Sequence, residues 1–206
     1  MTVETGPERL FTFLDAVVAI AITLLVLPLA ELLAGGGQRT GGLAELYADH
    51  AGEFGAFLLS FAVIARLWWA HHRLGERVGG HDAAFVLVNL LWVLTIVVLP
   101  FATQVVTAYP ATALPVATYV GTMTVSSASL TLLAVLVHRR DGLRKDGVPA
   151  RREDLVASVV TTVLYAVALV LGTTIRAVNY YGLLLLLLSG PIERLVARAL
   201  RTPDPS

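Results

Sequence analysis

Four residues near the N-terminus could form part of an ion pathway. Ile20, Leu24 and Leu27 recur at spacings of four and three, with Thr23 beside them, and these spacings place all four on one face of a helix. If several copies surrounded an axis, rings of large aliphatic side chains would form a constriction that gates by dewetting. A ring of threonines would then supply oxygen ligands for a partly dehydrated cation. In one isolated membrane span, the same stripe would contact lipid or a neighbouring helix, so periodicity alone leaves both interpretations open.

Two charged residues, Arg9 and Asp15, stand at the start of the same apolar segment. Their separation corresponds to about 600° of helical rotation, so the two side chains do not share a face. Partners are therefore expected elsewhere, and the candidates are Arg66, His71 and His72 in the second apolar segment, SFAVIARLWWAHHRLGER. Asp15 near the beginning of a helix also suits the positive end of the helix dipole. The alternative is that both residues only cap the helix and anchor it at the membrane interface.

The second apolar segment ends in WWAHH. Trp68 and Trp69 are typical of an aromatic belt at a membrane interface. His71 and His72 are adjacent and face different sides of a helix, whereas chelating histidines normally stand four residues apart. His72 and Glu76 have that spacing, but two ligands without a third do not make a metal site. The chain has no cysteine and no visible catalytic constellation, so we expect no metal, no cofactor and no enzymatic activity.

The composition indicates which elements position these residues. Of 206 residues, 56% are hydrophobic and 15% are charged, and the mean hydropathy is +0.75. Soluble domains usually carry about a quarter charged residues and less than half apolar ones. Because the apolar excess is spread along most of the chain, it predicts a polytopic membrane protein. The formal net charge is zero, which gives no indication of a nucleic-acid partner.

Six apolar stretches are long enough, or nearly so, to cross the hydrocarbon core as helices, which takes about 20 residues. They are 10–34, 52–71, 83–106, 112–137, 155–175 and 178–200. The last is the weakest, because its apolar part ends near Gly190 and is followed by Pro191 and several charged residues. The acidic start of the chain and the lack of a small-residue cleavage site indicate that the first stretch is retained rather than removed as a signal. The expected fold is all-α, a single six-helix transmembrane domain over residues 1–206.

Lysine and arginine residues predict the orientation. If the N-terminus is cytoplasmic, twelve of the fifteen basic residues lie inside, against Arg39 and Arg176 outside and Arg66 within the second span. The inside residues are Arg9, Arg73, Arg77, Arg139, Arg140, Arg144, Lys145, Arg151, Arg152, Arg194, Arg198 and Arg201. The positive-inside rule therefore predicts that both termini are cytoplasmic. The most basic connection, HRRDGLRKDGVPARRED, either sets this topology or binds lipid headgroups or an acidic partner.

Three segments together resemble a known family. RLFTFLDAVVAIAITLLVL is similar to the R-x-x-x-F-S-D signature that opens the first helix of the prokaryotic relatives of the animal lysosomal potassium channel. SFAVIARLWWAHH resembles the second-helix pattern of this family, with its Ser-Phe start and W-x-x-H-H end. NLLWVLTIVVLPFAT resembles its third helix. The three segments occur in the expected order over roughly the first half of the chain.

The resemblance implies a six-helix subunit of a tetrameric cation channel in which the first helices line the pore. It also implies that a TVGYG-type filter loop is absent, and no such sequence occurs here. By position, Ile20 corresponds to the narrow hydrophobic constriction, and Leu24 and Leu27 correspond to further rings toward the outside. Thr23 corresponds to the threonine layer linked to potassium preference in this family.

The resemblance also assigns a structural network to the base of the pore helix. Arg9, Phe13 and Asp15 fall on the signature, which in this family packs against the second helix near its histidine end. The residues of that end are Trp68, His71 and His72. One position departs from the pattern, because the signature serine is Leu14 here. The resemblance therefore implies that one hydroxyl is missing from the hydrogen-bond network at the helix start.

We expect a homotetrameric, potassium-permeable channel in a prokaryotic plasma membrane. Its partners would be potassium and other monovalent cations, the lipid bilayer and further copies of the chain, with no nucleic acid. The alternative is a secondary transporter of a small solute or ion. Residues 1–106 and 107–206 share no convincing motif of the inverted repeats typical of transporters, and no acidic residue falls near an expected membrane midplane. A membrane enzyme has no visible site in the sequence, and a structural scaffold stays open.

Overall fold

The structure, a computed structural model, describes residues 6–34, 42–149 and 152–174. Within those ranges the chain is helical and forms no β-strand, apart from an isolated bridge between Val78 and Arg144. The elements are α1 (Glu8–Leu24), α2 (Leu27–Ala34), α3 (Leu43–Asp49), α4 (Ala51–Gly75), α5 (Ala83–Ala108), α6 (Ala113–Arg139), the 3₁₀ turn η1 (Asp141–Leu143) and α7 (Arg152–Thr174). The all-α fold expected from the sequence is confirmed.

Five helical segments of the described chain are long and apolar enough to cross a membrane. They are Glu8–Leu33, Ala51–Gly75, Ala83–Ala108, Ala113–Arg139 and Leu155–Thr174. Each agrees with one of the first five expected spans to within four residues at either end. The expected sixth span, 178–200, lies outside the described residues. The chain is a multi-pass helical membrane protein, as its composition predicts.

The first span is not one continuous helix. α1 ends at Leu24 and α2 begins at Leu27, whereas the sequence predicts a single helix over 10–34. The cause is Pro28, which has no N–H to donate to the carbonyl of Leu24 and whose ring clashes with that carbonyl in a regular helix. Between the two helices, the N–H of Val26 donates to the carbonyl of Thr23 at 3.3 Å, the shorter 3₁₀-type bond. Part of the expected pore stripe therefore lies beyond a helix break.

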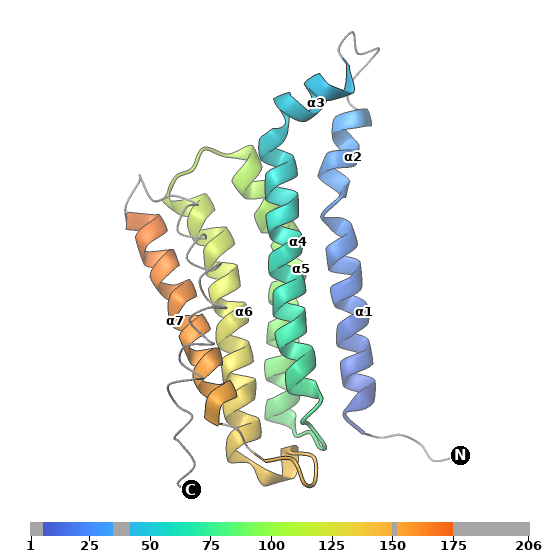
Figure 1. The fold of residues 1–206 in the computed structure, drawn as a ribbon, viewed down its shortest axis with the longest axis vertical. Coiled ribbons are helices and arrows are strands. Elements are labelled where there is room, and N and C mark those ends of the chain that lie inside the picture. Colours follow the sequence, from blue (N-terminus) through green and yellow to red (C-terminus); the bar gives the residue numbers. More distant parts are fainter. Residues whose placement is uncertain (1–5, 35–41, 150–151, 175–206) are drawn as a thin grey trace, which may run out of the picture.

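The long helices run side by side in one bundle (Figure 1). α6 lies between α5 and α7 and packs against both of them. α1 stands at the edge of the bundle, where it packs against α5 and α4. One side of α1 therefore contacts the rest of the chain, and its other side is open.

Hydroxyl groups join the helices inside the bundle. Ser60 on α4 is buried, lies 2.9 Å from the hydroxyl of Tyr119 on α6, and accepts a hydrogen bond from Thr103 on α5 at 2.8 Å. The hydroxyls of Ser127 on α6 and Thr162 on α7 are 2.9 Å apart. Such interhelical bonds contribute on average about 0.6 kcal/mol each in membrane proteins. They explain why these spans tolerate so many small polar residues.

The connections at one end of the bundle are tied together. Asp82 caps α5 by accepting the N–H of Phe85 at 2.8 Å, and it forms an ion pair with Arg140 at the end of α6. The Phe85 N–H and the Arg140 guanidinium hold the pKa of Asp82 below its usual value. Gly80 approaches the backbone of Gly142 so closely that a Cβ at position 80 would overlap its carbonyl oxygen. The α4–α5 connection and the segment after α6 therefore form one ordered end of the bundle.

Candidate functional site

α1 presents two different faces. Leu14, Val18 and Ala21 are buried against the bundle, and their spacing places them on one side of the helix. On the other side, Ile20 is 60% exposed in the single chain. The exposed residues include all four of the predicted pore stripe, Ile20, Thr23, Leu24 and Leu27. The stripe therefore does not pack in the core of its own chain and is available to lipid or to other copies.

Thr23 places a hydroxyl oxygen among the aliphatic side chains of this face. The hydroxyl of Thr23 donates to the carbonyl of Ile20 at 2.7 Å, which leaves its oxygen lone pairs as acceptors. Pro28 removes the N–H that would otherwise bond to the carbonyl of Leu24 in a regular helix. Hydroxyl and carbonyl oxygens are the groups that replace water around a partly dehydrated cation. The open face of α1 thus combines large apolar side chains with the hydroxyl oxygen of Thr23, a group compatible with a cation.

The base of α1 is tied to α4 through Asp15. Its carboxylate accepts the indole N–H of Trp68 at 2.9 Å. The partner does come from the second span, but it is Trp68 rather than Arg66, His71 or His72, the candidates chosen on charge. An indole N–H neutralises no charge, yet it donates a directed hydrogen bond to a carboxylate. The sequence analysis considered Trp68 only as part of an interfacial belt or of a family pattern, and missed this bond.

The aromatic ring that packs against the second helix is that of Phe11. Its centre lies 5.3 Å from the centre of the His71 ring. Gly75 permits this approach, because a Cβ at position 75 would lie 2.8 Å from the Phe11 ring. Phe13, the phenylalanine of the family signature, is 53% exposed on the open side of α1, and Arg9 is exposed as well. The packing implied for Phe13 is therefore made by Phe11, because Phe13 lies on the side of α1 that faces away from the bundle.

His71 lies at the centre of a buried cluster. Its Nε2 is 2.8 Å from Oδ1 of Asn89 on α5, and the amide of Asn89 donates to the carbonyl of Phe85 at 2.9 Å. Oδ1 must then accept, so Nε2 of His71 donates. The imidazole stacks on Trp92, with ring centres 3.8 Å apart and planes at 5°. In the sequence, Asn89 and Trp92 are two residues of the third-helix segment NLLWVLTIVVLPFAT, and only the three-dimensional contact pairs them with His71.

His72, directly next in the chain, has different surroundings. Its side chain is 43% exposed, its Nε2 is 4.0 Å from the carboxylate of Glu76, and its ring stacks on Trp69. Within the ranges that the structure describes, no group of three histidine, aspartate or glutamate side chains could hold a metal ion. His71 is therefore buried at the contact between α4 and α5, whereas His72 is exposed on the surface of α4.

Leu14 stands where the resemblance described above would place a serine. It is completely buried and belongs to the apolar core formed with α4 and α5. An apolar side chain in this place adds packing area and leaves no unpaired hydroxyl. The departure from the family pattern therefore changes the chemistry of the contact between α1 and the bundle, and it leaves the exposed stripe untouched.

Trp68→Phe is expected to lower the free energy of unfolding by about 1.5 kcal/mol, because the Asp15 carboxylate loses a donor while most of the ring remains. Chemical unfolding of the purified protein in detergent measures the loss. Trp69→Phe is the matched control, since the neighbouring indole is 54% exposed and its loss should cost less than about 0.5 kcal/mol. Equal losses in both variants would contradict a specific role for the Asp15–Trp68 bond.

The fold and this site define a class of protein. It is a multi-pass helical membrane protein in which one face of the first helix, with apolar side chains and a threonine hydroxyl, does not pack against the rest of the chain. Comparison with known proteins narrows the class. Residues 9–100 match the model of the family described as "Endosomal/lysosomal potassium channel TMEM175". The matched stretch runs from the start of α1 to Pro100 in α5 and contains both faces of α1, Trp68 and the His71 cluster.

Individual relatives agree with the family match. The chain is 34% identical over 106 residues to a potassium channel of Streptomyces collinus, covering 52% of this chain and 49% of that protein. It is 37% identical over 110 residues to a potassium channel of Chamaesiphon minutus, covering 52% and 51%. The human endosomal/lysosomal proton channel TMEM175 is 28% identical over 104 residues, covering 50% of this chain and 20% of that protein.

These matches confirm the resemblance drawn from the three sequence segments, and they place it on the first half of the chain. The matched region spans about half the length of the two bacterial relatives. The names of the relatives differ in the ion, potassium for the bacterial proteins and protons for the animal ones.

Proposed function

We propose that this chain is the subunit of a potassium-permeable cation channel, in which the open faces of α1 from four copies line one central pore. The observation that carries the proposal is the exposure of Ile20 and Leu24 on the side of α1 that faces away from the chain's own core, and of Leu27 at the start of α2. The match of residues 9–100 to a channel family supports it. The termini of each subunit would lie in the cytoplasm, and the membrane would be a prokaryotic plasma membrane.

The pore would use apolar side chains as both filter and gate. A ring of four Ile20 side chains forms the narrowest point, and Leu24 and Leu27 form rings farther along the axis. Water leaves such a constriction readily when it is narrow, which closes the pore to ions. When the rings separate slightly, an ion must shed part of its hydration shell to pass. Potassium holds that shell less tightly than sodium, so the constriction favours potassium.

Thr23 would lower the cost of this dehydration. Its hydroxyl oxygen lies within the exposed stripe and already donates its proton to the carbonyl of Ile20. The orientation of the hydroxyl is thereby fixed, with its lone pairs available to a cation. The carbonyl of Leu24, which lacks a helical partner because of Pro28, adds a second oxygen at the same level of the chain.

Flux measurements on purified protein in liposomes test the proposal. We expect potassium efflux that depends on the protein, rises linearly with the concentration gradient and needs no coupled ion. Flux that saturates and requires a second ion would instead favour a secondary transporter. Proton flux is measured in the same vesicles, because animal relatives are named proton channels. Protein-dependent proton flux without potassium flux would overturn the assignment of the ion.

A further inference from the structure

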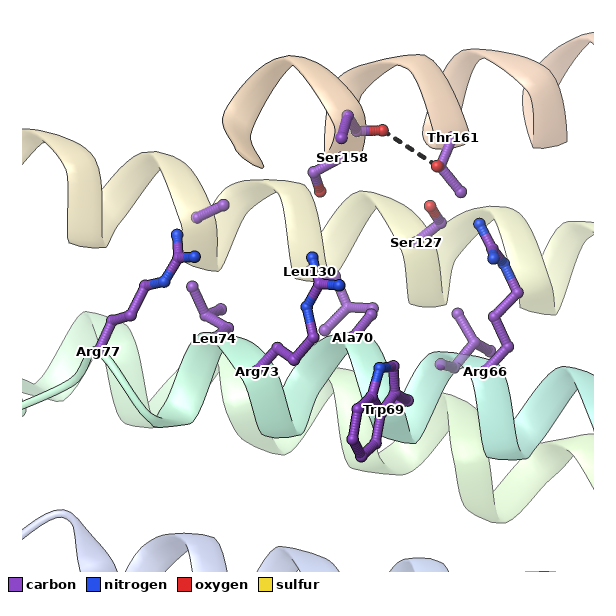
Figure 2. Close-up of a pocket in the computed structure, with 13 residues that line it drawn as sticks. Arg66, Trp69, Ala70, Arg73, Leu74, Arg77, Ser127, Leu130, Ser158 and Thr161 are labelled. Atoms are coloured by element: carbon purple, nitrogen blue, oxygen red, sulfur yellow. Dashed lines mark hydrogen bonds between the residues drawn. The ribbon is translucent and has the colours of Figure 1, made fainter. Parts of the chain in front are cut away.

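Three arginines, two on α4 and one just after it, line the same side of a cavity away from the pore stripe. Arg66 and Arg73 are seven residues apart on α4, which brings them within about 20° of one another around the helix, and Arg77 follows in the turn after α4. Figure 2 shows their side chains extending from α4 toward α6 and α7. The row begins inside the candidate membrane segment Ala51–Gly75 and ends just beyond it. A charged residue inside such a segment is costly unless something of opposite charge or polarity accompanies it.

The arginines face a cavity between α4, α6 and α7. Its volume is about 170 Å³, and its lining includes all three arginines. Ser127 of α6 and Ser158 and Thr161 of α7 contribute hydroxyl groups on the opposite wall (Figure 2). Among the described lining residues there is no aspartate or glutamate. The described walls of the cavity therefore carry guanidinium groups on one side and hydroxyl groups on the other.

The same cavity has an apolar side. Leu67, Ala70 and Leu74 of α4 and Leu130 of α6 line it between the polar groups, and Trp69 stands at its rim. Trp69 is more than half exposed, and indole rings favour the level of the lipid headgroups. A free inorganic anion would gain nothing from these apolar walls. A phospholipid can contact both walls, the polar wall through its charged headgroup and the apolar wall through its hydrocarbon chain.

We propose that this cavity binds the headgroup phosphate of an anionic phospholipid. Arg73, in the last turn of α4, and Arg77, just after the helix, hold the phosphate, because a guanidinium offers five N–H donors and can serve a phosphate in addition to another partner. Arg66 lies about 10 Å deeper along the helix, at the level of the ester oxygens. Basic spaces between membrane helices are a recurrent form of headgroup site. The acyl chains run along the apolar wall into the bilayer.

The location of the site agrees with the expected membrane orientation. It lies toward the end of the bundle where the α4–α5 and α6–η1 connections carry further basic residues, the end expected to face the cytoplasm. A bound lipid joins α4 to α6 and α7, and its site contains none of the residues of the pore stripe. The proposal therefore holds whether or not the chain conducts ions.

Binding is tested on the full chain in detergent by thermal unfolding and native mass spectrometry. Phosphatidylglycerol should raise the unfolding midpoint by several degrees more than phosphatidylcholine, and it should remain bound in the mass spectrum. Arg73→Gln with Arg77→Gln should weaken the apparent affinity for phosphatidylglycerol about thirtyfold, at roughly 1 kcal/mol for each arginine. Lys145→Gln, an exposed basic residue at the same end outside the cavity, is the matched control and should leave the affinity unchanged.

Three outcomes would overturn the proposal. Equal stabilisation by phosphatidylglycerol and phosphatidylcholine would show that the charge of the headgroup does not contribute to binding. Equal stabilisation by inorganic phosphate would make the cavity a free-anion site. An equal loss in the Lys145 variant would show unspecific charge attraction. If the double variant does not fold, Arg73→Gln alone is used, since Arg73 is exposed, and an unchanged affinity in that variant counts against the site.

Discussion

Replacing Ile20 with asparagine is expected to raise the cation flux and to reduce the preference for potassium over sodium. Four amide groups at the narrowest ring would keep the constriction wet and would offer oxygens to either ion. If the change removes about 1.4 kcal/mol from the dehydration barrier, the flux rises about tenfold. Flux of potassium and of sodium into liposomes, measured separately for the wild type and the variant, gives both numbers.

Val163→Asn is the matched control for this experiment. Val163 lies on α7, is 54% exposed, and therefore also presents a branched aliphatic side chain outside the chain's core. Its replacement introduces the same amide on a helix that does not carry the pore stripe. We expect unchanged flux and unchanged selectivity in this variant. Unaltered permeation in the Ile20 variant, or equal changes in both variants, would remove Ile20 from the pore.

Replacing His71 with alanine is expected to lower the free energy of unfolding by about 3 kcal/mol. The variant loses the stacking of the imidazole on Trp92, opens a cavity beside Phe11, and leaves Oδ1 of Asn89 without its donor. Buried large-to-small substitutions cost about 2–5 kcal/mol, and an unpaired buried acceptor adds about 1–3 kcal/mol. Equilibrium unfolding in detergent measures the loss.

The neighbouring histidine provides the control. His72→Ala removes the same side chain one position later, where it is half exposed, and should cost less than about 0.5 kcal/mol. A second comparison tests the hydrogen bond itself. His71→Phe combined with Asn89→Leu should be more stable than His71→Phe alone, because replacing both partners leaves no unpaired polar atom. Similar losses at positions 71 and 72 would contradict the buried cluster.

The helices could be predicted from the sequence because each span is a predominantly apolar run of the required length. The open stripe on α1 could be predicted for a similar reason. The periodicity of Ile20, Leu24 and Leu27 predicts which residues share a face, and the structure shows that they are exposed; that this face lines a pore stays a prediction from the family resemblance. The break at Pro28 was also readable in principle, since a proline in a helix interior removes a hydrogen bond whatever surrounds it. Hydropathy, from which the single span over 10–34 is predicted, does not register this break.

The contacts between helices could not be predicted in the same way. The rotation of each helix about its axis and its height in the bundle are set by packing of the whole chain. Asp15 therefore meets Trp68 rather than a charged residue, and His71 meets Asn89, eighteen positions later. For the same reason the ring that fills the space beside α4 belongs to Phe11 and not to Phe13. The spacing of residues within one helix does not show which side chains of two different helices will be in contact.

The central claim is that copies of this chain meet around the open face of α1. Because the chain has no cysteine, single cysteines can be introduced without removing any native one. In oxidised membranes, Ile20→Cys should form disulfide-linked pairs of subunits, since side chains at the narrowest ring approach one another within bonding distance. Val163→Cys, equally exposed in the single chain but on α7, should remain unlinked. Linkage at position 163 without linkage at position 20 would contradict the account.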